Sequence, residues 1–134
     1  RDRPCVTLPL AAGSASTSAQ SERAFVRGGR RYGHVIDPRT GVPVPGRASV
    51  TVVAASGTRA DALSTALLVM GRDAAERFAA SHPGVGVLWL EPAGRAVNAW
   101  CWNLLDVAAA PGATVRWMNS EPAPGLTLRT KGTP

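Results

Sequence analysis

Asp61 and Thr65 are the residues whose types and spacing most directly suggest chemistry. They lie four positions apart in a segment with helical apolar spacing, TRADALSTALLVMG, so a carboxylate and a hydroxyl share one helix face. Both are hard oxygen ligands, and two protein oxygens suit Mg²⁺, which takes its other ligands from water and substrate phosphates. A structural interpretation remains open, in which Asp61 completes a capping box with Thr58 and Thr65 bonds back to the preceding turn.

A second group of candidates lies upstream in YGHVIDPRTGVPVPG, residues 32–46. His34 can act as a general base or a ligand-binding group, or it can be held by a single structural hydrogen bond. The segment from Asp37 to Gly41 fits a turn, because an aspartate starts it, a proline fixes φ and a glycine relaxes the exit. Arg39 in this turn can reach a phosphate or a carboxylate, or it can brace its own loop.

The elements that must position these residues follow from the periodicity of the sequence. Residues 49–56 are β-branched and mostly apolar, which predicts a buried strand, and the helical spacing of residues 58–71 predicts a helix directly after it. Residues 22–37 predict a hairpin around a Gly-Gly pair, and the small polar residues 11–20 predict a loop. Further expectations are a strand at 6–10, a helix at 72–82, a strand pair at 85–92 and 95–102, and a tail over 120–134. The predicted class is α+β, with one mixed or antiparallel sheet and two helices packed against it.

Composition narrows the function classes. The 134 residues suit one domain, no apolar run approaches the roughly 20 residues of a membrane helix, and the net charge is +6 with Lys131 as the only lysine. A positive charge favours an anionic ligand such as a phosphate, whereas nucleic acid is disfavoured because the arginines are scattered and few aromatics interleave with them. Cys5 and Cys101 can pair in an oxidising compartment, but they lack further ligands at zinc-site spacing.

Two motifs, in this order and at this separation, resemble the C-terminal half of the ApbE family, the FAD:protein FMN transferases. HVIDPRTGVPV (residues 34–44) is similar to the family's His, two apolar residues, Asp-Pro-Arg-Thr-Gly pattern. SVTVVAASGTRADALSTALLVMG (residues 49–71) is similar to its strand and its Ala-Asp-Ala-Leu-(Ser/Ala)-Thr-Ala helix, and STSAQSERAF (residues 16–25) to its Thr-Ser-Gly segment. We therefore expect residues 1–119 to form the C-terminal portion of an ApbE-like domain.

The resemblance implies an enzyme that binds FAD and Mg²⁺ and transfers the FMN moiety onto a Ser or Thr hydroxyl of a target protein, releasing AMP. Some family members instead hydrolyse FAD to FMN and AMP. It implies Asp61 and Thr65 as metal ligands and His34 as a catalytic residue. Residues that match segments bordering the flavin site are Ser18, His34, Val35, Ile36, Asp37, Arg39, Thr40 and Gly41.

Departures from the family pattern set further expectations. Ala19 stands where the family usually has glycine, which would strain the backbone if φ were positive there, and Gly33 replaces a frequent second histidine. Family members are longer, and their N-terminal half carries glycine-rich segments and much of the FAD pocket. Because the chain is shorter than family members, we expect a fragment, one chain of a split enzyme completed by a partner half, or a non-catalytic flavin-binding module, and the start at Arg1 without a start methionine also suggests a fragment or a processed chain. The family also suggests the bacterial cell envelope or periplasm.

Overall fold

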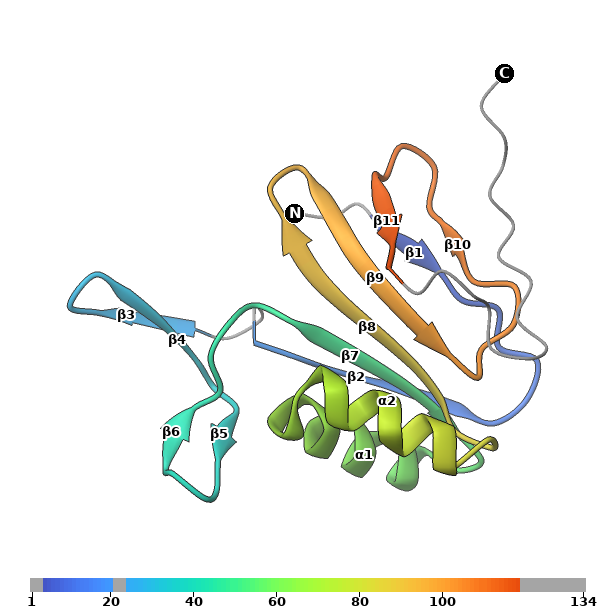
Figure 1. The fold of residues 1–134 in the computed structure, drawn as a ribbon, viewed down its shortest axis with the longest axis horizontal. Coiled ribbons are helices and arrows are strands. Elements are labelled where there is room, and N and C mark those ends of the chain that lie inside the picture. The colour runs from blue at the N-terminus through green and yellow to red at the C-terminus, as the bar shows by residue number, and fades with distance from the viewer. Residues whose placement is uncertain (1–3, 21–23, 119–134) are drawn as a thin grey trace.

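The computed structural model describes residues 4–20 and 24–118, so the expected tail over 120–134 lies outside the described residues. A five-stranded sheet in the order β11-β9-β8-β7-β2 carries two helices on one face (Figure 1). Its strands are β2 Ser14–Ala19, β7 Ser49–Ala54, β8 Gly86–Ala93, β9 Ala96–Trp102 and β11 Val115–Trp117. β11 runs parallel to β9 and the other pairs are antiparallel, which confirms the predicted mixed sheet and the α+β class.

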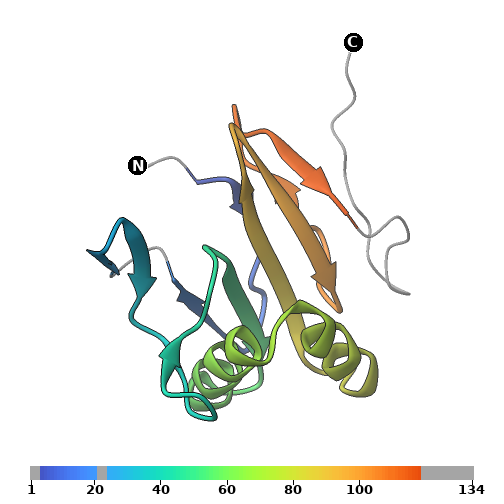
Figure 2. The same ribbon diagram turned by 60° about the vertical axis from the view of Figure 1, so that its left-hand side comes forward.

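Three two-stranded pairs accompany the main sheet. They are β1 Val6–Thr7 with β10 Ala108–Ala109, β3 Ala24–Arg27 with β4 Arg30–Gly33, and β5 Ile36–Asp37 with β6 Val42–Pro43. The β3–β4 pair confirms the predicted hairpin, since Gly28 and Gly29 have φ values of 57° and 73°, as a two-residue turn of this kind requires. The β3–β4 hairpin extends away from the body of the molecule, whereas the β5–β6 hairpin lies beside α1 (Figures 1 and 2).

The strand β2 corrects the sequence prediction, which had a loop over residues 11–20. Its six residues pair with β7 in unbroken antiparallel register, from Ser14 opposite Ala54 to Ala19 opposite Ser49. Side chains alternate between half-buried and exposed positions from Ser14 to Ser18, so the period of two is present, and the final residue, Ala19, is buried. Every residue is small or polar, which hides this period from a hydrophobicity pattern. Ala19 is buried and has no positive φ, so alanine is not strained there.

The helix α1 spans Gly57–Met70 and α2 spans Arg72–Ser81. α1 begins after Ser56, whose side chain accepts a hydrogen bond from the Arg59 backbone N–H at 3.3 Å. The predicted cap at Thr58 is therefore wrong by two residues, because the serine before Gly57 supplies the acceptor. The predicted end at Gly71 is confirmed, with φ of 90° at that residue.

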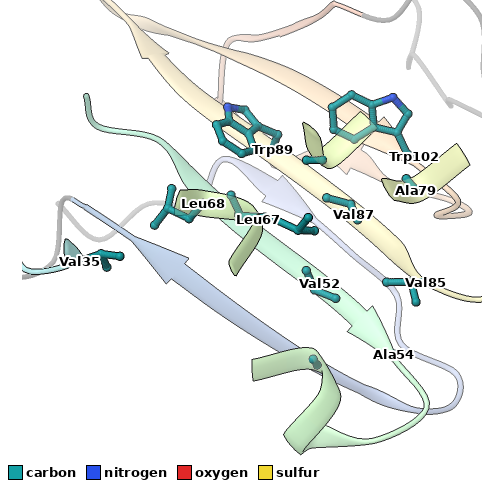
Figure 3. Packing of buried hydrophobic residues seen from close by; sticks show 13 residues of the cluster. Val35, Val52, Ala54, Leu67, Leu68, Ala79, Val85, Val87, Trp89 and Trp102 are labelled. Carbon is teal, nitrogen blue, oxygen red and sulfur yellow. The ribbon is translucent and has the colours of Figure 1, made fainter. Parts of the chain in front are cut away.

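One core lies between the sheet and the helices. Leu67 and Leu68 of α1 are buried against β7, and Trp89 and Trp102 lie under the helical layer from β8 and β9 (Figure 3). Trp100 is partly buried and carries the Arg72 guanidinium 4.6 Å above its ring. Trp89 and Trp102 are therefore core residues, and Trp100 packs against the core from its edge. No helix in the described part of the chain has the length and apolar character needed to cross a membrane.

Candidate functional site

Asp61 and Thr65 lie on the face of α1 that packs along the edge strand β2. The Ser16 hydroxyl donates to Asp61 Oδ1 at 2.9 Å, and the Ser18 and Thr65 hydroxyl oxygens are 2.8 Å apart. We call these four side chains the hydroxyl seam. Ser18 also lies 2.9 Å from the Ser64 hydroxyl, so β2 meets α1 through a continuous series of oxygen atoms.

The seam exists because the repeats of a strand and a helix nearly coincide. Two strand residues span about 6.6 Å and four helix residues about 6.0 Å, so the step from Ser16 to Ser18 matches the step from Asp61 to Thr65. The match extends one step back, where Ser14 lies opposite Gly57. Every second residue of β2 therefore lies opposite every fourth residue of α1, which pairs Ser14 with Gly57, Ser16 with Asp61 and Ser18 with Thr65.

The structural alternatives for Asp61 and Thr65 are both wrong. Asp61 completes no capping box with Thr58, because Ser56 caps the helix. The hydroxyl that bonds back along the helix belongs to Ser64, which donates to the Asp61 carbonyl at 3.0 Å. Both predicted metal ligands instead direct their oxygens toward β2, and both are exposed.

The donor set of the seam fits a hard divalent cation such as Mg²⁺. It consists of oxygen atoms alone, one carboxylate and three hydroxyls, and it contains no nitrogen or sulfur ligand of the kind zinc prefers. Among the described residues, no group of three or more His, Cys, Asp or Glu side chains is placed to hold a metal ion. A cation at Asp61 and Thr65 would thus need water and phosphate oxygens to complete its coordination, which is typical of Mg²⁺ with a nucleotide.

The turn that follows His34 is built around the carboxylate of Asp37. Asp37 Oδ1 accepts from the Arg39 backbone N–H and from Arg39 Nε, both at 2.9 Å, and Oδ2 accepts from Nη2 at 2.7 Å. The hydrogen bonds from Arg39 lower the pKa of Asp37, and the same pair raises the pKa of Arg39. The carbonyl of Asp37 accepts from the amides of Thr40 and Gly41. Arg39 therefore braces its own loop, the second of the two roles proposed for it.

Two apolar cavities flank this loop. The loop–helix cavity, about 520 Å³, is lined by Ile36, Pro38 and Arg39 from the loop and by Ala62, Thr65, Ala66, Val69 and Met70 from α1. The hairpin cavity, about 580 Å³, is lined by Ala24, Phe25, Gly33, His34, Ile36 and Pro43. Ile36 forms a wall of both. The structure thus brings Thr65 together with Ile36 and Arg39, and it places His34 in the neighbouring cavity.

Two residues of the candidate site escaped the sequence analysis. Ser16 completes the hydroxyl seam, and Gln20 is 1% exposed with its amide bound to the loop backbone. Val35, predicted to border the flavin, has its side chain in the core. The period of two in β2 could have revealed Ser16, whereas a single glutamine among small residues gives no signal of burial.

The fold and the seam define an α+β domain that presents a cluster of one carboxylate and three hydroxyls beside an apolar cavity. The chain belongs to the ApbE family, whose model matches residues 2–89. It is 48% identical over 64 residues to an FAD:protein FMN transferase of Rhodobacter capsulatus and 38% identical over 91 residues to one of Treponema pallidum. The crystal structure of the ApbE protein from Thermotoga maritima superposes with a TM-score of 0.53 at 43% identity, over 60% of this chain.

The matched segments are small parts of these proteins. They cover 48% and 67% of this chain but only 12% of the Rhodobacter protein and 25% of the Treponema protein. The superposed part is 26% of the Thermotoga chain. The matched part of this chain therefore corresponds to about a quarter of these relatives or less, and the chain contains the loop and the helix that carry the two motifs.

Proposed function

We propose that this chain provides the cation- and diphosphate-facing part of an enzyme that transfers FMN from FAD to a Ser or Thr hydroxyl of a target protein, releasing AMP. The observation that carries the proposal is the hydroxyl seam beside the loop–helix cavity. Thr65 belongs to both, so a cation held by Asp61 and Thr65 would lie at the rim of a cavity suited to an apolar ring system. The names of the relatives, FAD:protein FMN transferase, support the same reaction.

Asp61 and Thr65 would hold Mg²⁺ and Ser16 and Ser18 would orient them. When bound, this ion would neutralise charge on the diphosphate of FAD during its cleavage. Ser16 fixes the direction of the Asp61 carboxylate by donating to one of its oxygens. Ser18 restrains the Thr65 hydroxyl in the same way, so two positions of β2 prearrange the two ligands on α1.

The group transfer requires removal of one proton from the acceptor. The acceptor hydroxyl oxygen would bond to the phosphorus on the FMN side of FAD, and the bridging P–O bond would break, with its electron pair leaving on AMP. We assign His34 as the base that takes the hydroxyl proton, because its ring is exposed and lines the cavity next to the loop–helix cavity. An acceptor segment would then enter from the side of the hairpins.

The test is to incubate the purified 134-residue chain with FAD, Mg²⁺ and a peptide that carries a flavin-acceptor Ser or Thr. Mass spectrometry of the peptide should show an added FMN group, and chromatography should show AMP in equal amount. AMP without modified peptide would indicate the FAD-hydrolysing branch of the family. If neither product forms, catalysis by this chain alone is contradicted.

Variants separate the proposed roles. Asp61→Asn should reduce the rate at least about hundredfold at limiting Mg²⁺, because the seam has a single carboxylate. Asp73→Asn, an exposed carboxylate on α2, should leave the rate unchanged.

His34→Gln should lower the rate about 10²- to 10⁴-fold, whereas His82→Gln, at the end of α2, should not. Full activity in His34→Gln would remove the base assignment and leave the cation site intact.

Two observations favour a second function. The matched segments cover only a small part of the relatives, and the two hairpins expose apolar side chains. Phe25, Val26, Ile36 and Val42 are each more than half exposed, which suits a surface completed by a partner half that carries the rest of an ApbE fold. In this alternative the chain binds flavin or nucleotide without turning it over. Calorimetry with FAD and assay of AMP separate the two, since a binding module gives heat of binding but no AMP.

We also propose the bacterial envelope as the place of action, which fractionation of cells with antibody detection would test.

A further inference from the structure

Gln20 has a buried amide whose partners, among the residues that the structure describes, belong to the loop that follows His34. Its Nε2 donates to the Val35 carbonyl at 2.9 Å and to the Val44 carbonyl at 2.8 Å, and its Oε1 accepts from the Val35 N–H at 3.1 Å. Val44 N–H also donates to the Val35 carbonyl at 2.9 Å. The side chain therefore closes the base of the β5–β6 hairpin, where the chain enters it at Val35 and leaves it at Val44.

The backbone of Gln20 connects this amide to the main sheet. Gln20 directly follows β2, and its N–H donates to the Ala48 carbonyl just before β7. β2 is also the strand whose serines contact Asp61 and Thr65. One short segment thus contacts the proposed metal ligands through Ser16 and Ser18, and the loop through Gln20.

Gly33 supplies the space for the amide. A Cβ at this position would overlap Gln20 Oε1 and Cδ, and the backbone of Gly33 has no positive φ that would itself require glycine. The absence of a side chain at Gly33 is therefore explained by contact with Gln20. Gly33, which stands where the family often has a histidine, is thus required by the buried amide of Gln20, so the two residues belong together.

We propose that Gln20 is a positioning residue that fixes the loop of residues 34–44 relative to α1 and so sets the width of the loop–helix cavity. The ligand named for that cavity rests on the proposed function, whereas the positioning of the loop does not. Without the amide, the Val44 carbonyl and the Val35 N–H lose this partner in a buried place, and the Val35 carbonyl keeps only the bond from the Val44 N–H. The hairpin relieves this loss by moving outward. Ile36, Pro38 and Arg39 would then separate from Thr65 and Val69, and the cavity would open.

The experiment is hydrogen exchange by NMR on the full chain and on three variants. Gln20→Met keeps the volume and removes the hydrogen bonds, Gln20→Glu replaces the donor by an oxygen, and Gly33→Ala pushes the amide aside. Each should raise the exchange rate of the Val35 and Val44 amides by at least about tenfold while the β7–β8 ladder keeps its protection. The matched control is Gly84→Ala, whose added Cβ meets nothing within 4 Å and whose φ is not positive.

Titration with FAD provides the readout that a purely structural role would not give. In the variants, FAD affinity should fall at least about tenfold at temperatures where all proteins are folded, and Gly84→Ala should match the parent. Unchanged Val35 exchange in Gln20→Met and Gly33→Ala would overturn the positioning role. Loss of protection across the β7–β8 ladder as well would show a general role in stability and would also overturn it. If the parent chain binds no FAD, the proposed function fails for the isolated chain, and the exchange rates alone decide on Gln20.

Discussion

The carboxylate of Asp37 determines the shape of the motif-bearing turn. It accepts three hydrogen bonds from Arg39, one of them from the backbone, and its carbonyl accepts two more from Thr40 and Gly41. Because Arg39 is 69% exposed, its ion pair with Asp37 contributes to the conformation of the loop more than to global stability. At the scale of single residues, the Asp-Pro-Arg-Thr-Gly motif of residues 37–41 therefore stabilises the conformation of its own backbone.

The titration of Asp37 follows from this geometry. Since the folded pKa lies below the ordinary 3.8, the ion pair is fully formed above about pH 4 and is lost as the pH falls through the lowered pKa. Carboxyl ¹³C shifts should therefore give a midpoint below 3.8 for Asp37. Arg39→Gln should return it only part of the way, because the backbone N–H of residue 39 still donates. A midpoint at or above 3.8 in the parent chain would contradict the contacts described.

The two cysteines should differ in reactivity. Both are thiols in the structure, and burial raises the pKa of Cys101 to about 12. At pH 8 and without denaturant, iodoacetamide should modify the partly exposed Cys5 and leave Cys101 protected, because the thiolate is the reactive form. Peptide mass spectrometry gives both rates, and unfolding in guanidinium should equalise them. Equal rates in the native protein would mean that the strand β9 opens readily.

At the scale of elements, α1 was predictable and its start was not. The spacing of apolar residues fixes a helix over most of Gly57–Met70, but two hydroxyl residues, Ser56 and Thr58, compete for the cap. Tertiary structure decides between them, since the extended backbone at Ser56, with ψ of 152°, continues from β7 directly into the helix. The correct cap then leaves Asp61 available to β2.

The cap can be tested by two alanine substitutions. Ser56→Ala should lower the free energy of unfolding by about 1 kcal/mol, because it removes the acceptor for the Arg59 N–H. Thr58→Ala, at the second residue of the helix, should lower the free energy of unfolding by less than about 0.5 kcal/mol. Urea unfolding followed by circular dichroism measures both. A larger loss in Thr58→Ala would restore the capping box that the structure excludes.

At the scale of the whole molecule, one core joins the two helices to the sheet. Leu67 is 1% exposed and packs in the cluster that contains Val52, Val87 and Trp89. This cluster aligns α1 with the sheet and therefore also aligns Asp61 with Ser16. The site depends on the core for its geometry, although none of its oxygens lies in the core.

Core truncation should reveal that dependence. Leu67→Ala should lower the free energy of unfolding by roughly 2–5 kcal/mol, the range for buried leucines. Leu105→Ala, at a side chain that is 58% exposed, should change it by less than about 0.5 kcal/mol. Guanidinium titration monitored by tryptophan fluorescence measures both. Similar values for the two variants would contradict the assignment of Leu67 to the core.

The sequence was sufficient for the class, the helices, the β3–β4 hairpin and the central strands, because their apolar periods are strong. It was insufficient for β2, where an alternating pattern of serine, alanine and threonine carries no hydrophobic contrast. It was also insufficient for Gln20, because burial of one amide depends on the distant backbone of Val35 and Val44. Both failures concern contacts between segments far apart in the chain, and both lie at the candidate site.

The matching repeats of β2 and α1 also restrict how the length of this chain can vary in evolution. Inserting one residue between Ser16 and Ser18 would turn the second hydroxyl to the other face of the sheet, and inserting one between Asp61 and Thr65 would rotate Thr65 by about 100° away from β2. Insertions in the turn at Gly28 and Gly29 would alter neither step, since that turn lies outside both segments. Relatives that retain the seam should therefore conserve the lengths of these two short segments while their hairpins differ freely, which an alignment of many family members can show.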